Sequence, residues 1–219
     1  MLDFLNILWE ALPYFHPEKG RERVGCILSL LFIFDMGGVV TINTNVIPSI
    51  VEYLGITEKR FFQLAGENWT KLLTGKIDVQ QFWLQISNQI NRKIKENLFA
   101  AYFHPRRNFE VIEIINDLKK KYRIVCGTNT FQIHYQYHLE QGDYDFFDKV
   151  YASHLMGIAK PDKLFYQYIL KHENVTKERT VFIDDTMENV ISACNIGIQS
   201  IHFRDSDLLK NDLKNFLIY

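Results

Sequence analysis

An apolar run that ends in an acidic residue is the feature that most constrains the fold of this 219-residue chain. Residues Leu28–Phe34 are apolar or small, and Asp35 follows them directly, ahead of the turn-forming pair Gly37-Gly38. Such a run predicts a strand that is buried on both faces, as in parallel sheets covered by helices. A carboxylate at the C-terminal end of this strand would lie where open α/β sheets bind their ligands. An Asp here can also be a simple turn or cap residue, so the later motifs decide between the two.

Three later segments carry polar groups that complete a recognisable chemical set, namely Ile124–Asn129, Gly157–Asp162 and Val181–Asn189. In the first and third, the polar groups directly follow short apolar runs of strand character. Lys160 instead falls in the loop after the run Lys149–Ser153. A nucleophilic carboxylate, a small hydroxyl, an ammonium group and a carboxylate pair are the groups that magnesium-assisted phosphoryl transfer requires. Together, in this order, the four motifs indicate a phosphoryl-transfer site.

The order Asp, Thr, Lys, Asp-Asp resembles the four motifs of the haloacid dehalogenase-like hydrolase superfamily, over roughly Leu28–Phe203. The resemblance implies that Asp35 is the nucleophile and forms an aspartyl-phosphate. It implies that Thr128 hydrogen-bonds the transferring phosphoryl group, with Asn129 beside it. Lys160 would pair with Asp35 and the phosphoryl oxygens.

The same resemblance implies Mg²⁺ as cofactor. Asp35, Asp185 and the backbone carbonyl of Gly37 would bind the ion, with Asp184 in or next to the coordination shell. The stretches 157–162 and 182–189 look like those of the bacterial branch that hydrolyses sugar phosphates and related small phosphate esters.

Gly37 departs from the family pattern. Most phosphatases of the superfamily have a second Asp at this position, where it protonates the leaving oxygen and then activates water. Glycine has no side chain for this role, which typically contributes about 10²–10⁴-fold in rate. A branch with Asp-x-Gly-Asn at this motif resembles sugar-1-phosphate phosphatases, so the glycine does not by itself imply an inactive protein. Other branches without the second Asp act on carbon–phosphorus or carbon–halogen bonds.

These features leave three functions open. The first is a Mg²⁺-dependent hydrolase of small phosphate esters, with sugar-phosphate-like substrates and an aspartyl-phosphate intermediate. The second is a catalytically weakened relative that binds a phosphorylated ligand or partner. The third is a hydrolase of carbon–phosphorus or carbon–halogen bonds. The complete set of Asp35, Thr128, Lys160, Asp184 and Asp185 favours the first.

The predicted fold is a doubly wound, Rossmann-like α/β core with a small inserted helical cap. The core comprises residues 28–44 and 103–219, the cap residues 45–102, and residues 1–27 form an N-terminal extension that we expect to be helical. From Phe109 on, helical and strand patterns alternate, which predicts a parallel sheet with right-handed crossovers. The predicted strands are Arg123–Gly127, Lys149–Ser153, Thr180–Ile183 and Ile198–Phe203. The predicted helices are Phe109–Lys120, Phe131–Gln141, Lys163–Lys171, Met187–Ile196 and Asp205–Leu217.

Five aromatic residues lie in or next to the predicted cap. Because their neighbours recur at helical spacing, we interpret them as bundle core rather than as residues that stack on substrate. They are Trp69, Phe82, Trp83, Phe99 and Phe103.

Histidines and arginines outside the four motifs have weaker assignments. His134 and His138 have the i, i+4 spacing of a zinc pair, but no third ligand follows, and we expect them to lie far from the acidic loops. His104 lies where the chain returns from cap to core and is a candidate hinge or active-site residue. Arg106 and Arg107 follow it and are expected at the solvated surface, with a substrate anion as the alternative partner.

Composition excludes several other classes. A net charge of −1 gives no electrostatic reason to expect a nucleic acid or an anionic membrane as partner. The three cysteines include no Cys-x-x-Cys pair, so neither a disulfide framework nor a thiolate zinc site is indicated, and we expect a cytoplasmic protein. Cys126 and Cys194 are predicted as small core residues. No segment approaches the ~20 apolar residues that span a bilayer. Both monomer and homodimer remain open.

Overall fold

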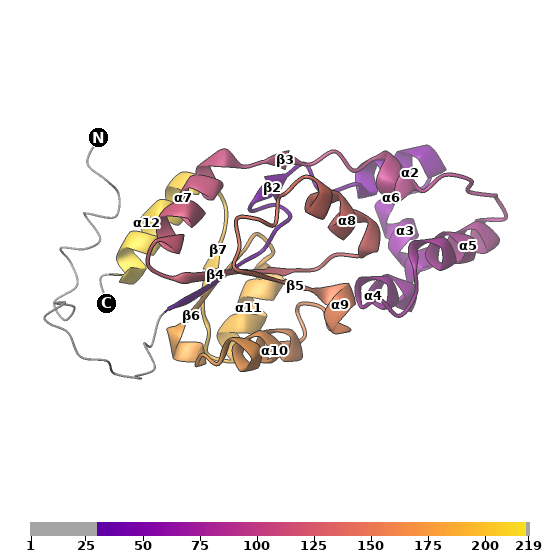
Figure 1. The fold of residues 1–219 in the computed structure, drawn as a ribbon. Helices are drawn as coiled ribbons and strands as arrows, with labels where there is room; N and C mark the ends of the chain where they lie inside the picture. Colours follow the sequence, from indigo (N-terminus) through magenta and orange to yellow (C-terminus); the bar gives the residue numbers. More distant parts are fainter. Residues whose placement is uncertain (1–29, 218–219) are drawn as a thin grey trace, which may run out of the picture.

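The sheet at the centre of the protein is parallel throughout. The computed structural model describes residues 30–217, with side chains to residue 214, and Figure 1 shows the arrangement of its elements. The strands run in the order β5-β4-β1-β6-β7, and every neighbouring pair is parallel. Their bounds are β1 Leu31–Phe34, β4 Arg123–Thr128, β5 Lys149–Ala152, β6 Thr180–Asp184 and β7 Gln199–His202. The predicted parallel α/β sheet is confirmed.

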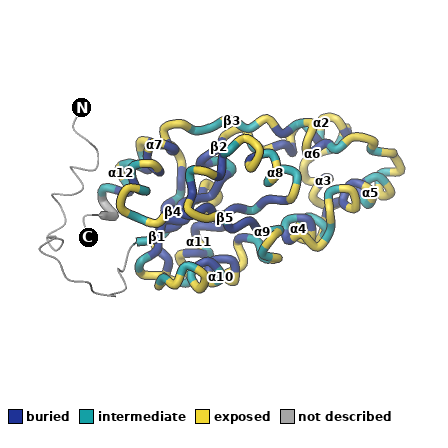
Figure 2. The backbone as a smooth tube through the Cα atoms, viewed as in Figure 1, coloured by how far each residue is buried: buried dark blue, intermediate teal, exposed yellow. Residues whose placement is uncertain are grey.

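Helices cover both faces of this sheet, as the predicted doubly wound fold requires. Successive side chains of a strand point to opposite faces. Phe32 and Phe34 of β1 accordingly join the core under α7 (Phe109–Lys119) and α12 (Ser206–Leu217). Leu31 and Ile33 join the core under α10 (Lys163–Glu173) and α11 (Met187–Asn195). The buried strands lie between these two helical layers, whose outer surfaces are exposed (Figure 2).

A block of five helices lies beside the sheet, between β1 and α7 in the sequence (Figure 1). Local signals fix its helix ends. Gly55 closes α2 in the left-handed conformation, the Thr57 side chain caps α3, and Asp78 forms a capping box with Gln81 at the start of α5. The block comprises α2 Ile47–Leu54, α3 Glu58–Ala65, α4 Glu67–Leu73, α5 Val79–Ile90 and α6 Leu98–Ala101.

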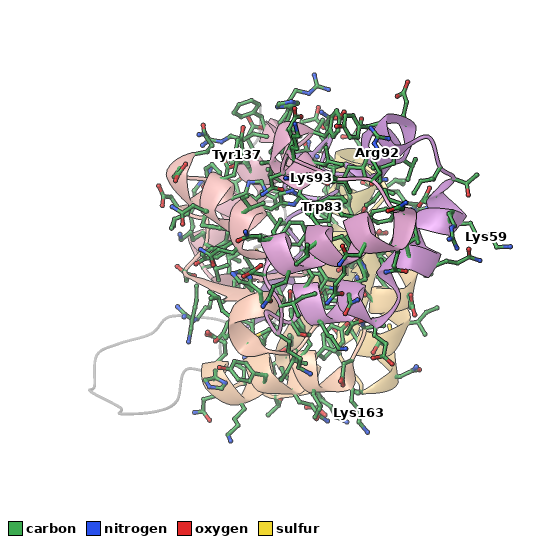
Figure 3. All side chains as sticks on the ribbon, turned by 90° about the vertical axis from the view of Figure 1, so that its right-hand side faces the viewer. Lys59, Trp83, Arg92, Lys93, Tyr137 and Lys163 are labelled. Atoms are coloured by element: carbon green, nitrogen blue, oxygen red, sulfur yellow. The ribbon has the colours of Figure 1, made fainter. Side chains whose placement is uncertain are left out.

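The helical block has its own aromatic core, which includes Phe82, Trp83, Phe99 and Phe103, with Trp69 packed against it. Phe131, just before α8 (Gln132–Glu140), also belongs to this core. The α8 segment therefore joins the block to the sheet. Viewed from the block end, Lys59 of α3 and Lys163 of α10 extend outward at separate edges of the molecule (Figure 3).

A two-stranded ribbon, which the sequence did not predict, forms where the chain leaves and re-enters the sheet layer. It pairs β2 (Thr41–Ile42) with β3 (Arg106–Arg107) in antiparallel fashion. The short helix α9 (Ser153–Met156) and the 3₁₀ turn η1 (Lys177–Arg179) were likewise not predicted.

Ser153, the first residue of α9, joins the helical block to the sheet. Its Oγ lies 2.6 Å from the carbonyl oxygen of Leu73, at the end of α4, and 3.0 Å from the carbonyl oxygen of Thr130. The same Oγ accepts the backbone N–H of Thr130 at 3.0 Å. One hydroxyl therefore contacts both parts of the molecule.

Predicted and observed boundaries of the later helices and strands agree to within one or two residues. The core assignment of Cys194 is wrong, because the buried positions on its helix include Val190 and Ala193, and the next residue turns toward solvent. Cys126 is buried as predicted. The predicted extension over residues 1–27 lies outside the described residues. Within residues 30–217, the structure has no helix that is both long and apolar enough to cross a membrane.

Candidate active site

Three of the predicted site residues meet because their strands are neighbours. Thr128 ends β4, Asp184 ends β6, and Asp35 follows β1, which lies between these two strands. The backbone N–H of Asp35 donates to the carbonyl of Ile183 at 2.8 Å, so the hydrogen-bond ladder continues one residue past β1. The carboxyl ends of parallel strands form one edge of a sheet, and this edge carries the candidate site.

Lys160 reaches the same edge from the loop after α9. Its ammonium group donates to Asp35 Oδ1 at 2.8 Å, to Asp184 Oδ2 at 2.7 Å and to the Gly127 carbonyl at 2.9 Å. The Lys160 side chain is 1% exposed, so these three acceptors use its donors almost completely away from water. We refer to Asp35, Thr128, Lys160, Asp184 and Asp185 as the strand-end cluster.

Asn129 holds the backbone of the lysine loop. Its Nδ2 donates to the Lys160 carbonyl and its Oδ1 accepts the Lys160 N–H, both at 2.8 Å. This pair of hydrogen bonds ties the end of β4 to the loop. The phosphate contact of Asn129 stays a prediction, whereas these two hydrogen bonds show that its side chain positions Lys160.

Asp184 is fully buried and has several hydrogen-bond partners besides Lys160. Its Oδ1 accepts the Thr186 N–H at 2.8 Å, and Asn189 Nδ2 lies 3.1 and 3.2 Å from its two carboxylate oxygens. Asn189 was not assigned a role from the sequence, although it follows the Asp-Asp pair in the first turn of α11, where a side chain can reach back to the strand end. Asp185 is exposed and lines the adjoining cavity.

Carboxylate oxygens from Asp35, Asp184 and Asp185 lie within 4.8 Å of one another. Within residues 30–217 no other group of three or more histidine, cysteine or acidic side chains converges in this way. The set contains only hard oxygen donors and no histidine or cysteine, which fits Mg²⁺ better than zinc. The residues present therefore fit the predicted ion.

Burial and mutual repulsion perturb the charges of the cluster. Burial raises the pKa of Asp35 to about 7, with Lys160 opposing the shift and Asp184 adding to it. Although Asp185 is exposed at one side, desolvation by the surrounding protein atoms raises its pKa, and the Asp184 carboxylate adds to that shift. Burial by itself would lower the pKa of Lys160, but Asp35 and Asp184 together raise it above its ordinary value. The site is therefore acidic and short of positive charge, as a cation-binding site should be.

The turn after Asp35 depends on two glycines in different ways. Gly38 has φ of +83°, and a Cβ at this residue would lie 2.1 Å from Asp185 Oδ2, so only glycine fits. Gly37 lies outside the left-handed region, and the nearest atom to a Cβ built on it is Thr44 Oγ1, at 3.2 Å. Thr44 therefore fills the space beside the position where the family has its second Asp.

A cavity of about 860 Å³ opens over the strand-end cluster. Residues Asp35, Gly37, Thr128, Asn129, Lys160 and Asp185 line one end of it. Its far side is lined by residues from α4, α8 and the segment between the ribbon and α6. These far-side residues include Trp69, Leu73, Thr74, Phe103, His134 and His138. Trp69 and Phe103 thus contribute to both the bundle core and the cavity.

The structure shows where the histidines lie. His134 and His138 line the far side of the same cavity as Asp35, a shared position that the sequence did not predict. Sequence distance is misleading here because α8 folds back over the edge of the sheet that carries the site. His104 is exposed, does not line the cavity, and contributes only its carbonyl, which accepts from Asn43 Nδ2 at 2.9 Å.

The two arginines after His104 lie in β3 and do not line the cavity. Arg106 is exposed. Arg107 Nε donates to Asp143 Oδ1 at 2.6 Å, so its charge is paired within the protein.

Comparison with known proteins matches residues 30–197 to a family model described as haloacid dehalogenase-like hydrolase. A sesquiterpene phosphatase of Aspergillus oryzae is 29% identical over 181 residues, which cover 80% of this chain and 89% of that protein. A D-ribitol-5-phosphate phosphatase of Bacteroides thetaiotaomicron is 23% identical over 184 residues, covering 77% and 88% of the two chains.

Solved structures share the fold. A HAD family enzyme of Bacteroides thetaiotaomicron, in complex with magnesium and inorganic phosphate, superposes with a TM-score of 0.67 at 22% identity, over 83% of this chain and 98% of that one.

Proposed function

The chain belongs to the haloacid dehalogenase-like hydrolase family, and from that premise we propose that it hydrolyses small phosphate esters with Mg²⁺ through a phosphorylated Asp35. The observation that carries this proposal is the geometry around Lys160. One buried ammonium group contacts both Asp35 and Asp184, and the exposed carboxylate of Asp185 lies beside them.

Asp35 is placed to act as the nucleophile. Lys160 binds its Oδ1, whereas Oδ2 accepts no hydrogen bond from the part of the chain that the structure describes. Oδ2 is therefore the oxygen free to attack phosphorus. The phosphorus–oxygen bond to the alcohol then breaks, and the leaving oxygen takes its proton from water. A further water molecule later cleaves the Asp35 acyl-phosphate to inorganic phosphate and the free carboxylate.

Two further side chains, those of Thr128 and Lys160, are placed to contact the phosphoryl group. The hydroxyl of Thr128 lines the cavity and makes no hydrogen bond within residues 30–217, so it is available to a phosphoryl oxygen. Lys160 neutralises part of the charge on Asp35 and on the transferring group. Asp35, Asp185 and the Gly37 carbonyl would hold Mg²⁺, with Asp184 behind them, and the bound ion would supply the remaining positive charge.

Leaving-group protonation lacks the usual carboxylic acid because residue 37 is glycine. Thr44 Oγ1 lies nearest to the missing side chain and lines the cavity. A threonine hydroxyl can donate a hydrogen bond to the leaving oxygen, but it is too weak an acid to replace a carboxyl group.

We propose that residues 28–44 and 103–219 form the catalytic core and that residues 45–102 act as the cap that meets the alcohol part of the substrate. Named relatives act on a sesquiterpene phosphate or on D-ribitol 5-phosphate, as their names state. Both names support phosphatase chemistry, but the alcohol part of the substrate differs between the two relatives. They include one polyol phosphate, in line with the sugar-phosphate-like substrates that the motifs predict.

A second candidate is a protein that binds a phosphorylated ligand without useful turnover, and Gly37 is the observation that favours it. The two candidates differ in one measurement, which is the release of inorganic phosphate from a panel of phosphate monoesters with Mg²⁺. We expect wild-type protein to release phosphate and Asp35→Asn to lose at least about 10³-fold in rate, because no other carboxylate can take the phosphoryl group. Asp207→Asn on α12, whose side chain is 89% exposed, is the matched control. Phosphate release by pure Asp35→Asn at the wild-type rate would exclude the covalent mechanism.

A further inference from the structure

The cavity has two chemically different ends. The strand-end cluster provides carboxylates, a hydroxyl and an ammonium group, whereas the far side is formed by Trp69, Leu73, Thr74, Phe103, His134 and His138. We call this second set the apolar wall. The volume of about 860 Å³ lies toward the upper end of the roughly 300–1,000 Å³ of typical ligand pockets. A phosphate group alone would leave most of the cavity empty.

Three polar atoms of the apolar wall, one each on Thr74, His134 and His138, bond within the protein. Thr74 Oγ1 donates to the Thr70 carbonyl at 2.7 Å. His138 Nδ1 lies 2.8 Å from Asp143 Oδ2, and both side chains are buried. These bonds use part of the hydrogen-bonding capacity that a hydroxyl-rich ligand would need.

His134 behaves as one more aromatic ring of the wall. Its Nε2 bonds to the Phe99 carbonyl at 3.0 Å, and its ring stacks on Phe103 with centroids 3.7 Å apart and planes 10° apart. Burial lowers the pKa of His134 to about 4 and also lowers the pKa of His138. Both rings are therefore neutral near pH 7.

Formal charge is absent from the buried part of this wall. Among the cavity-lining residues that the helical block and α8 contribute, Lys76 alone carries a charge, and its side chain is exposed at the rim. Lys160, the other cation that lines the cavity, is already engaged at the strand ends by Asp35 and Asp184.

We infer that the substrate is a phosphate monoester of an apolar alcohol, whose hydrocarbon part packs against the apolar wall while its phosphate meets the strand-end cluster. This inference rests on the proposed phosphatase function, specifies its substrate class, and replaces the sugar-phosphate-like alcohol that the sequence motifs predict. A sugar would place several hydroxyl groups against Trp69, Leu73 and Phe103, where each unpaired hydroxyl costs free energy. A hydrocarbon has no polar group to leave unpaired and gains from the burial of its surface.

Binding of alkylphosphonates tests this inference without requiring turnover. Methyl-, butyl- and octylphosphonate carry the same anionic head and differ only in apolar length. We expect calorimetry with Mg²⁺ to show affinity rising by about fourfold for each methylene that the wall buries. Affinity independent of chain length would overturn the inference.

Hydrolysis provides the second measurement. At concentrations below micelle formation, kcat/KM for octyl phosphate should exceed that for butyl phosphate, whose leaving alcohol has a similar pKa, and KM for both should lie below the values for glucose 6-phosphate and a nucleoside monophosphate. Equal kcat/KM for the two alkyl esters, or a lower KM for the sugar phosphate or the nucleotide, would overturn the inference. If no ester releases phosphate, p-nitrophenyl phosphate included, the proposed catalytic function fails, while the phosphonate affinities still decide the nature of the wall.

A pair of leucine variants locates the effect. Leu73→Gln replaces an apolar side chain of the wall by a polar one of similar size, and we expect it to reduce octylphosphonate affinity by about tenfold while methylphosphonate affinity stays unchanged. Leu155→Gln on α9, at a leucine that is 63% exposed and does not line the cavity, is the control. Thermal unfolding verifies that both variants fold. Equal losses for the two phosphonates in Leu73→Gln would contradict the assignment of the wall.

Discussion

The strand-end cluster and the apolar wall differ in how each holds its polar groups. The cluster buries an ammonium group among carboxylates. All its members stand at or next to the end of a strand except Lys160, which reaches this edge from the loop after α9. The wall consists of apolar side chains, neutral rings and one hydroxyl, and this hydroxyl and one nitrogen of each histidine bond inside the protein. The first arrangement keeps charge available for chemistry, whereas the second removes it from contact with a ligand. Reactivity and selectivity are thus assigned to separate parts of the chain.

Removal of a carboxylate from the strand-end cluster should cause the largest loss of Mg²⁺ binding and activity. We expect Asp185→Ala to abolish Mg²⁺ binding and all Mg²⁺-dependent hydrolysis, because Asp185 is the exposed member of the three converging carboxylates. Asp184→Ala should weaken Mg²⁺ affinity by about 10–100-fold, the range typical of groups that position a ligand. Calorimetric titration with Mg²⁺ measures both, and Asp207→Ala is the control. Undiminished affinity in Asp185→Ala would refute the metal assignment.

A carboxyl group introduced at residue 37 should give the strand-end cluster the general acid that it lacks. Gly37→Asp should accelerate hydrolysis of alkyl phosphates by up to about 10²–10⁴-fold and flatten the dependence of rate on leaving-group pKa, because it supplies a general acid. The backbone of Gly37 permits a side chain if Thr44 Oγ1, 3.2 Å from the new Cβ, moves slightly.

The measurement is a plot of log rate against leaving-group pKa for aryl and alkyl phosphates. Gly37→Ala adds the Cβ without the carboxyl group and should keep the steep wild-type slope. A wild-type slope near zero would mean that an efficient acid already exists, and our interpretation of Gly37 would then be wrong.

Loss of the buried ammonium group should affect stability as well as chemistry. Lys160→Met leaves Asp35 and Asp184 without their shared partner, and we expect the free energy of unfolding at pH 8 to fall by about 3–5 kcal/mol. Lys210→Met, which breaks an exposed pair with Asp207, should cost at most about 1 kcal/mol. Urea unfolding measures both. Similar small changes in the two variants would show that the cluster is not stabilised by its central charge.

A buried neutral histidine in the apolar wall should make the free energy of unfolding depend on pH. Because burial lowers the pKa of His134 from 6.5 to about 4, the unfolded chain binds a proton that the folded state excludes over this interval. The contribution of His134 to stability is therefore complete above pH 6.5 and is lost as the pH falls toward 4. At about 1.4 kcal/mol per pH unit, the loss should reach about 3 kcal/mol.

His134→Gln keeps a side chain that can bond to the Phe99 carbonyl and removes the titration. We expect the stability of this variant to fall less between pH 6.5 and 4 than that of the wild-type protein, as followed by urea unfolding at a series of pH values. His172→Gln, at an exposed histidine, is the control. Parallel stability curves for His134→Gln and wild type would contradict a buried neutral ring.

The sequence predicted the strand-end cluster because each of its motifs is local. Asp35, Thr128 and Asp184 directly follow or end apolar strands, and parallel strands bring such ends to a common edge. The family resemblance supplied the order of the motifs. It did not supply the hydrogen bonds from Asn129 to the lysine loop or from Asn189 to Asp184, since these depend on how two loops meet.

The apolar wall could not be predicted in the same way. His134 and His138 show only a helical spacing in the sequence, and the contact of His134 with Phe103 joins residues from separate elements. Thr44 gains its position from the β2–β3 ribbon, whose strands have two residues each and leave no periodic pattern. Packing between distant segments decides these positions, and a single sequence does not encode it in any local feature.

The hydroxyl of Ser153 has a consequence for any separation of the helical block from the sheet. Its single hydrogen has two acceptors within reach, the carbonyl of Leu73 on the block and the carbonyl of Thr130 on the sheet side. If α4 moved away, the hydroxyl could rotate from the first acceptor to the second and would stay paired, while water would solvate the released carbonyl. Reversible opening of the cavity would then leave no buried donor unpaired at this contact, so the Ser153 hydroxyl adds little to the free-energy cost of separating the two parts.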